Sequence, residues 1–107
     1  MKRGDLVTIA LQGDYGKPRP ALVVQSDLFD EHPSVSVMPV TGDLRATPLF
    51  RIDVVPTPEN GLHKPSQVMV DKVQAVSREK IGSSFGQIEA ATLQAVDEAL
   101  ARWFGLA

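Results

Sequence analysis

Turn signals divide most of this chain into short segments, and that spacing constrains the fold more than any other feature. The segments are rich in β-branched residues and stop near glycine, proline or asparagine, which is the pattern of short strands joined by turns. The predicted strands are residues 6–11, 21–25, 34–38, 49–55, 67–70 and 73–76, the last two being either separate strands or one bent strand. Short strands with frequent turns favour a small barrel or a strongly curved sheet.

The hydrophobic period changes in the last part of the chain. Beyond residues 81–82, apolar side chains recur three and four positions apart, which indicates an amphipathic helix. This stripe consists of Ile88, Ala91, Ala95, Ala99 and Trp103, widened by Val96, Leu100 and Phe104. Ser84 and Gln87 fit a capping box at its start, and Gly105 is expected to end it. We therefore predict one terminal helix that covers an open side or end of the sheet.

Length and composition narrow the setting. The 107 residues leave room for a single domain, residues 1–107, with one core. The 11 basic and 13 acidic residues give a net charge of −2, so binding to nucleic acid requires a local basic patch. The absence of cysteine excludes disulfides, thiol catalysis and thiolate zinc sites. A polar N-terminus and the lack of a long apolar run predict a cytoplasmic protein with no signal peptide or membrane span.

An arginine stands between two prolines where an apolar strand begins, in residues 17–26. Proline fixes its own φ and biases the preceding residue toward extended backbone, so Arg19 is expected at a stiff strand end. A guanidinium held there can present two parallel donors to a phosphate with little loss of rotamer entropy. Thr41 ends a second strand, residues 37–41, and offers a hydroxyl. Together the two residues predict a phosphate-handling site. Each taken alone is also explained as an ordinary surface arginine and as a hydroxyl bonded within its turn.

Other familiar chemistries are absent from the sequence. It contains no Walker-type or dinucleotide-binding glycine motif and no nucleophile elbow. His32 and His63 are far apart, so no histidine pair is spaced for a metal. His63 is either a solvated loop residue or a catalytic one. The acidic cluster of residues 27–31 is interpreted as a solvated turn. We expect no metal and no cofactor.

Taken in order, these elements resemble the MazF/PemK family of toxin endoribonucleases, within the CcdB/PemK-like superfamily, over nearly the whole chain. The resemblance begins at the Gly4-Asp5 pair before an apolar strand. It continues through the Arg-Pro-x-hydrophobic signature of residues 19–22 and the Pro-x-Thr element of residues 39–41. Residues 67–73 and residues 96–100 are similar to later segments of the family.

The resemblance implies a mainly β (α+β) fold, a small SH3-like curved sheet or barrel with a C-terminal α-helix, and a homodimer. It implies metal-independent, sequence-specific cleavage of single-stranded mRNA that causes growth arrest. The implied partner is a cognate antitoxin protein, through which alone the toxin contacts DNA. Arg19 and Thr41 match the catalytic pair of the family.

Three departures from the family pattern affect the site. Pro18 stands where some members have a histidine, and Gly42 where some have a second hydroxyl. Met69 takes the place of an arginine that one PemK-type branch uses with its aspartate. For this reason Asp71, the matching aspartate, is a weaker catalytic candidate.

Metal-free cleavage of RNA has its own chemical requirements. The 2′-OH attacks the adjacent phosphorus, leaving a 2′,3′-cyclic phosphate and a 5′-OH, and the doubly charged phosphorane needs preorganised cationic donors. Arg19 suits this task because it is permanently charged and forked. Neither Arg19 nor Thr41 is a good general base near neutral pH, so Asp71, His63 and water remain open for that role. Lys17 and Pro39 are expected to bind substrate.

Tyr15, in a glycine-flanked loop, is the candidate for stacking on an unpaired base. The alternative is that its ring packs the loop down onto the protein. The sequence does not define the RNA motif that is cut.

A rival hypothesis comes from the CcdB toxins, which share the fold and poison DNA gyrase without nuclease activity. Residues 24–27 and 103–106 resemble them. Trp103 and Phe104 also belong to the helical stripe, which predicts that they pack on the sheet. CcdB proteins lack the Arg-Pro and Pro-x-Thr pair, and this favours the ribonuclease.

Overall fold

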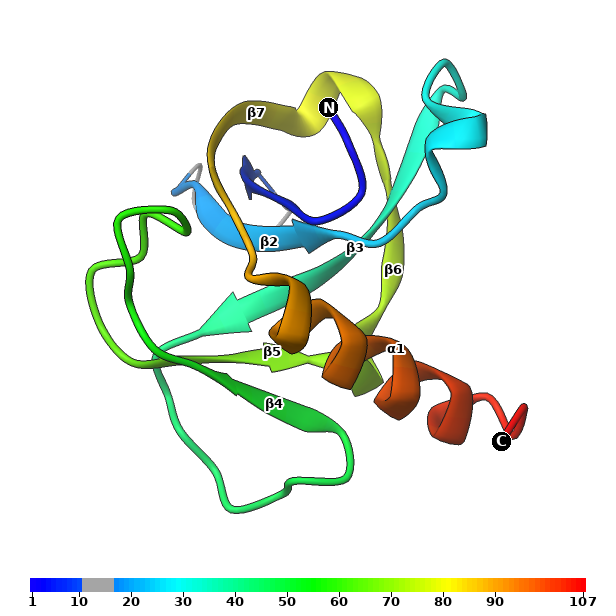
Figure 1. Ribbon diagram of the computed structural model, residues 1–107. Helices are drawn as coiled ribbons and strands as arrows, with labels where there is room; N and C mark the ends of the chain where they lie inside the picture. The colour runs from blue at the N-terminus through cyan, green and yellow to red at the C-terminus, as the bar shows by residue number, and fades with distance from the viewer. Residues whose placement is uncertain (11–16) are drawn as a thin grey trace.

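The computed structural model describes residues 1–10 and 17–107. Seven strands and one helix follow each other along the chain (Figure 1). They are β1 (Asp5–Ile9), β2 (Arg19–Val23), β3 (Ser34–Thr41), β4 (Arg51–Val54), β5 (Ser66–Met69), β6 (Gln74–Ser77), β7 (Ile81–Gln87) and α1 (Ala90–Trp103). Three single 3₁₀ turns lie between them: η1 (Asp27–Phe29), η2 (Val70–Lys72) and η3 (Arg78–Lys80). The prediction of a mainly β chain with a terminal helix is confirmed.

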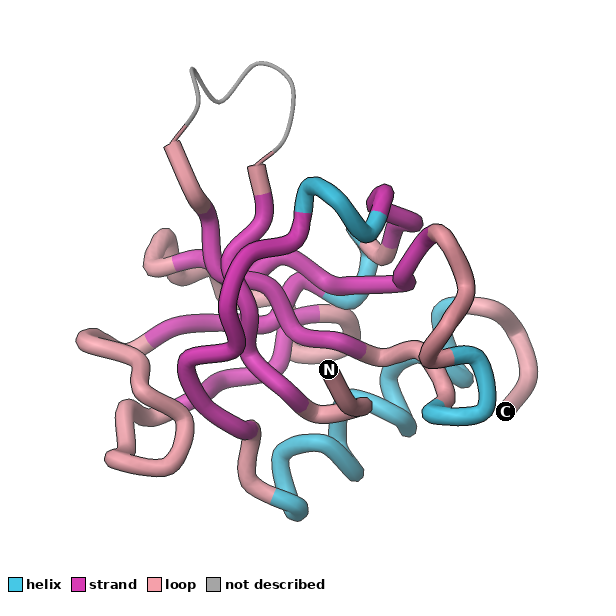
Figure 2. Tube along the Cα trace, turned by 90° about the horizontal axis from the view of Figure 1, so that it is seen from above, coloured by secondary structure: helices cyan, strands magenta, loops and turns pink. Residues whose placement is uncertain are grey.

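The strands form one antiparallel sheet in the order β4-β5-β3-β2-β1-β7. The sheet is strongly curved (Figure 2). The long strand β3 has two partners on the same edge. β5 pairs with its end, where Thr41 faces Gln67, and β6 pairs with its beginning, where Ser34 faces Ser77. Residues 67–76 are therefore two strands separated by η2. Within residues 1–10 and 17–107 the sheet does not close into a barrel, because β4 and β7 are not paired with each other.

Two apolar clusters occupy the two faces of this sheet. Neighbouring residues of one strand alternate between them: Leu6 of β1 joins the first cluster and Val7 the second, as do Leu22 and Val23 of β2. The first cluster lies under α1, which contributes the buried Val96 and Ala99. Because β1 and β2 are buried on both faces, their apolar side chains hold the central strands rigidly next to the site.

β7 corrects the predicted start of the helix. Residues 81–87 are a strand paired with β1, with register shifts, and Glu89 rather than Ser84 is the helix N-cap. The prediction was wrong because β7 is mostly exposed and contains two glycines where a side chain does not fit. A Cβ at Gly82 would lie 2.3 Å from Thr8 Oγ1, and one at Gly86 would lie 2.3 Å from the carbonyl oxygen of Asn60.

The end of α1 also differs from expectation. Gly105 ends the helix with φ +73°, as predicted. Trp103 and Phe104, which were expected to pack on the sheet, are 49% and 58% exposed. The Trp103 ring packs against that of Phe50, with ring centroids 5.9 Å apart. The helical stripe therefore turns away from the core over its last turn.

None of the helices in the described ranges is both long and apolar enough to span a membrane.

Candidate active site

A groove of about 920 Å³ opens where β2 begins and β3 ends. The loop of residues 61–64 and the ring of Phe85 on β7 form further parts of its wall. Its lining residues are Thr8, Ile9, Pro18, Arg19, Pro20, Pro39, Val40, Thr41, Gly42, Gly61, Leu62, His63, Lys64, Ser66, Met69, Lys72, Gln74 and Phe85. In the described part of the chain, this wall carries three cations, Arg19, Lys64 and Lys72, and no carboxylate. A local basic surface is thus present despite the negative net charge.

Sheet register brings Arg19 and Thr41 together. β2 and β3 are antiparallel, with Leu22 facing Met38 and Ala21 facing Pro39. Arg19 begins β2 and Thr41 ends β3, so both residues lie at the same end of this pair of strands, two residues beyond Ala21 and Pro39. Both residues line the groove. Two residues that are far apart in the sequence therefore meet at one end of the sheet.

The Thr41 hydroxyl keeps its hydrogen for a ligand. Its oxygen accepts a hydrogen bond from the Asp43 backbone N–H at 3.0 Å. The local turn bond considered from the sequence is therefore present. It uses only a lone pair of the oxygen, so the O–H can still donate to a phosphate oxygen in the groove.

Gln67, which the sequence did not single out, holds the turn after Thr41. This buried residue faces Thr41 across the β3–β5 pair. Its amide oxygen accepts from the Arg45 N–H, and its amide nitrogen donates to the Arg45 carbonyl, both at 2.9 Å. Its nitrogen also donates to Asp53 Oδ1 at 2.9 Å. The Gln67 amide thus hydrogen-bonds both backbone groups of Arg45, as the backbone of a paired strand would. The sequence indicated it only in that Gln67 is the one amide of an otherwise apolar predicted strand, residues 67–70.

An ion pair lies on the same turn. Arg45 Nη2 donates to Asp43 Oδ2 at 3.0 Å. The hydrogen bond from Arg45, then its charge, lower the pKa of Asp43 below the ordinary value, against the opposing effect of burial; the charge of Arg51 also lowers it. Asp43 is therefore ionised at neutral pH, and Arg45 is already paired.

The loop before Lys64 is fixed to the start of α1 by Glu89. Its carboxylate accepts from Thr57 Oγ1 at 2.7 Å and from Asn60 Nδ2 at 3.0 Å. The fully buried Asn60 accepts in turn from the backbone N–H groups of Thr57 and Leu62. Burial favours the neutral form of Glu89, but the hydrogen bonds from Thr57 and Asn60 outweigh it and lower its pKa.

We expect Glu89→Ala to lower the free energy of unfolding by about 1–3 kcal/mol at pH 7, because the half-buried Thr57 hydroxyl and the buried Asn60 amide each lose a hydrogen bond to the carboxylate. A native carboxylate with a lowered pKa stabilises the fold above the ordinary pKa of glutamate, and this stabilisation is lost as pH falls through the lowered value. Urea unfolding at pH 7 and in acid should therefore show a difference that shrinks in acid. Glu59→Ala, at an exposed residue of the same loop, is the control. A difference that grows in acid would contradict this account.

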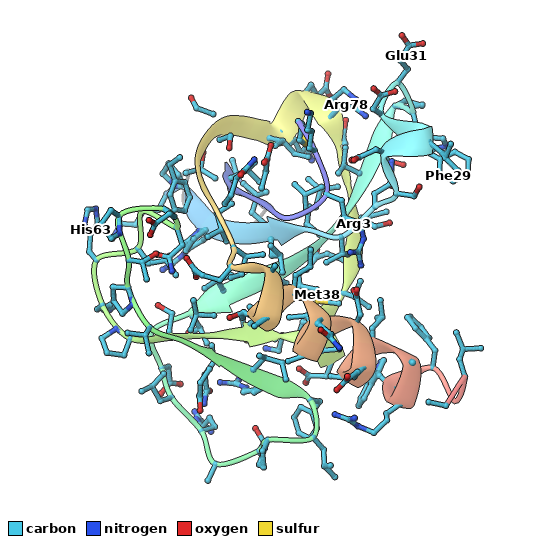
Figure 3. All side chains as sticks on the ribbon, in the orientation of Figure 1. Arg3, Phe29, Glu31, Met38, His63 and Arg78 are labelled. Atoms are coloured by element: carbon cyan, nitrogen blue, oxygen red, sulfur yellow. The ribbon has the colours of Figure 1, made fainter. Side chains whose placement is uncertain are left out.

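The other predicted site residues are placed as follows. Pro39 and His63 line the groove, and His63 lies at the outer edge of its loop (Figure 3). Lys17 is exposed, immediately before the groove residue Pro18. Asp71 lies on η2 and is not in the groove wall, and its buried Oδ1 has no hydrogen-bond partner in the described chain. Tyr15 lies outside the described residues. No group of three or more histidine, aspartate or glutamate side chains in residues 1–10 and 17–107 is placed to hold a metal ion.

Comparison with known proteins identifies the family of the chain. A family model described as PemK-like, MazF-like toxin of type II toxin–antitoxin system matches residues 2–104. A probable endoribonuclease MazF of Mycolicibacterium smegmatis is 42% identical over 108 residues, covering 100% of this chain and 99% of that protein. The structure of Mycobacterium tuberculosis toxin MazF-mt6 is similar with a TM-score of 0.82 and 27% identity, over 96% of this chain and 98% of that one.

A mycobacterial endoribonuclease solved in complex with its cognate antitoxin has the same fold, with a TM-score of 0.81 and 23% identity, over 100% of this chain and 97% of that one. The chain belongs to the family of PemK-like and MazF-like toxins of type II toxin–antitoxin systems, and its enzyme class is endoribonuclease.

Proposed function

We propose that this toxin cuts single-stranded mRNA in the cytoplasm, without metal, by attack of the substrate's own 2′-OH. The bond from the 2′-oxygen to phosphorus forms and the bond from phosphorus to the 5′-oxygen breaks. The 2′ proton goes to a base, and the departing 5′-oxygen gains a proton. The products are a 2′,3′-cyclic phosphate and a 5′-OH. The observation that carries the proposal is the placement of Arg19 and Thr41 in one groove, at the same end of β2 and β3, in a wall that also carries Lys64 and Lys72.

Each member of the pair has a role that its chemistry supports. The Arg19 guanidinium presents two parallel donors to the non-bridging oxygens, whose charge increases in the phosphorane. The Thr41 hydroxyl donates to one of the same oxygens. Of the groups open as the base, His63 lies in the groove wall and Asp71 does not. This placement favours His63 or water.

Selection of single strands is supported by an aromatic wall that the sequence did not reveal. Phe85 is 37% exposed and faces the groove. A Cβ at Gly61 would lie 2.6 Å from the Phe85 carbonyl oxygen and 3.1 Å from its ring, so only glycine allows the loop to lie this close. The loop at Gly61 therefore packs directly against Phe85. Exposed aromatic rings stack on unpaired bases in RNA-binding proteins.

Phe85→Ala should weaken RNA binding by roughly tenfold, the scale of one lost base–aromatic stack of about 1–3 kcal/mol. KM should rise while kcat stays near wild type, and Phe85→Tyr should keep the wild-type values. Steady-state cleavage of a short RNA measures both constants. An unchanged KM in Phe85→Ala would remove the ring from the substrate site.

The proposed partners are a second copy of the chain and an antitoxin. Exposed apolar side chains at the end of α1, Trp103, Phe104 and Leu106, support a homodimer. The mycobacterial complex supports an antitoxin, for which we propose an acidic segment laid across the basic groove, with any DNA contact made through the antitoxin. Light scattering that detects only monomer at micromolar concentration would refute the dimer.

A test with two substrates separates this function from gyrase poisoning. Purified protein is incubated with RNA in EDTA, and in parallel with gyrase and supercoiled DNA. We expect RNA cleavage and unaffected gyrase. Trapped gyrase with intact RNA would instead support the CcdB-like activity.

A further inference from the structure

Gly42 leaves a gap in the groove wall that the side chain of Lys64 fills. A Cβ built on Gly42 would lie 2.3 Å from Lys64 Cε, 2.8 Å from Nζ and 3.2 Å from Cδ. The end of the lysine therefore rests against the backbone of the residue that follows Thr41. Any larger residue at position 42 would occupy the same space. Gly42, which stands where some family members have a second hydroxyl residue, thus leaves room for the Lys64 side chain.

Lys64 reaches this position from the loop before β5, the strand that pairs with the end of β3 at Thr41. Its carbonyl oxygen accepts from Ser66 Oγ at 2.9 Å. The residues before it are fixed by Asn60, whose side chain accepts from the Leu62 N–H at 3.0 Å. The backbone of the loop is therefore anchored on both sides of Lys64. Only its flexible four-carbon stem remains to be placed, and the gap at Gly42 receives it.

The charge of Lys64 is available for a ligand. In the described part of the chain its ammonium makes no hydrogen bond and no ion pair, whereas Arg45, on the turn after Thr41, is paired with Asp43. Lys64 lines the groove with Arg19 and Thr41. An unpaired cation beside Gly42, the residue that follows Thr41, is suited to an anion bound in this part of the groove.

We propose that Lys64 is a second cationic catalytic residue, contacting the scissile phosphate, and that Gly42 is the positioning residue that keeps it beside Thr41. The inference rests on the proposed function. The phosphorane carries two negative charges and Arg19 supplies one positive charge, so a second cation balances the transition state. The ammonium acts as a point charge with three donors. It transfers no proton in this account.

The test compares Lys64→Gln with Lys72→Gln, which removes another lysine of the same groove. At saturating RNA, Lys64→Gln should lower the single-turnover rate on the order of a hundredfold, the scale of one lost transition-state donor. Lys72→Gln should mainly raise KM, and Lys64→Arg should recover part of the rate. Equal effects of the two glutamine variants on the rate would overturn the proposal.

Gly42→Ala tests the gap itself, because its methyl group displaces a flexible side chain and leaves the fold intact. The variant should be slower than wild type, and adding Gly42→Ala to Lys64→Gln should cost nothing further, since both changes remove the same contact. Effects that multiply would refute the positioning role. If the wild-type protein leaves no 2′,3′-cyclic phosphate, both the proposed function and this inference fail. If the wild-type protein leaves this product and Lys64→Gln cleaves as fast as wild type, only this inference fails.

Discussion

Arg19→Ala should fold normally and lose roughly two to three powers of ten in cleavage rate at saturating RNA, the scale of a lost donor to a developing oxyanion. Folding should be unaffected because the side chain is exposed at the first residue of β2, outside both apolar clusters. Rate should fall because the phosphorane loses a charged, bidentate partner. Single-turnover kinetics on a short labelled RNA measures the rate, and circular dichroism checks the fold.

Three further variants define what Arg19 contributes. Arg19→Lys keeps the charge without the planar fork, so it should restore only part of the rate. Thr41→Ala should lose less than Arg19→Ala, because it removes one neutral donor. Arg45→Ala is the matched control, since this arginine lies on the turn after Thr41 but does not line the groove. Near-wild-type cleavage by Arg19→Ala would remove the mechanism.

Replacing the single 2′-OH beside the scissile phosphate should abolish cleavage altogether. An RNA with one deoxynucleotide on the 5′ side of that phosphate has lost its nucleophile, yet it keeps every phosphate and base that the groove contacts. We therefore expect it to bind with nearly unchanged affinity and to compete with normal RNA. Gel analysis of cleavage, with binding measured by fluorescence anisotropy, separates the two effects.

The control substrate carries the deoxynucleotide two positions away and should be cut at the normal rate. A hairpin that hides the same sequence in a duplex should resist cutting, because its bases are stacked. Cleavage of the deoxy substrate at the modified position would show that the 2′-oxygen is not the nucleophile.

The parts of the fold that were predictable are those in which local pattern and tertiary structure agree. β-branched residues and turn signals located β1 to β6, because each strand buries apolar side chains against its neighbours. β7 was missed because its two glycines serve close packing against Thr8 and Asn60, a long-range requirement that locally resembles a helix start. The exposure of Trp103 and Phe104 was missed because a helical stripe does not say how far the core extends.

Some residues of the candidate site could likewise be predicted from the sequence, and others could not. Arg19 and Thr41 were identified because prolines and strand ends mark them in the sequence. Gln67, Lys64 and Glu89 contact loops or turns outside their own segments, and the sequence did not identify those partners. Asp71 was proposed from its position in a motif, and its placement on η2, outside the groove wall, depends on a local 3₁₀ turn between two strands.

The chemical ends of the RNA fragments test the central claim most directly. Wild-type protein is incubated with a short RNA in excess EDTA, and the fragments are weighed by mass spectrometry. Attack by the 2′-OH predicts cleavage at an undiminished rate, with a 2′,3′-cyclic phosphate on one fragment and a 5′-OH on the other. Fragments with a 5′-phosphate, or loss of cleavage on chelation, would contradict the account.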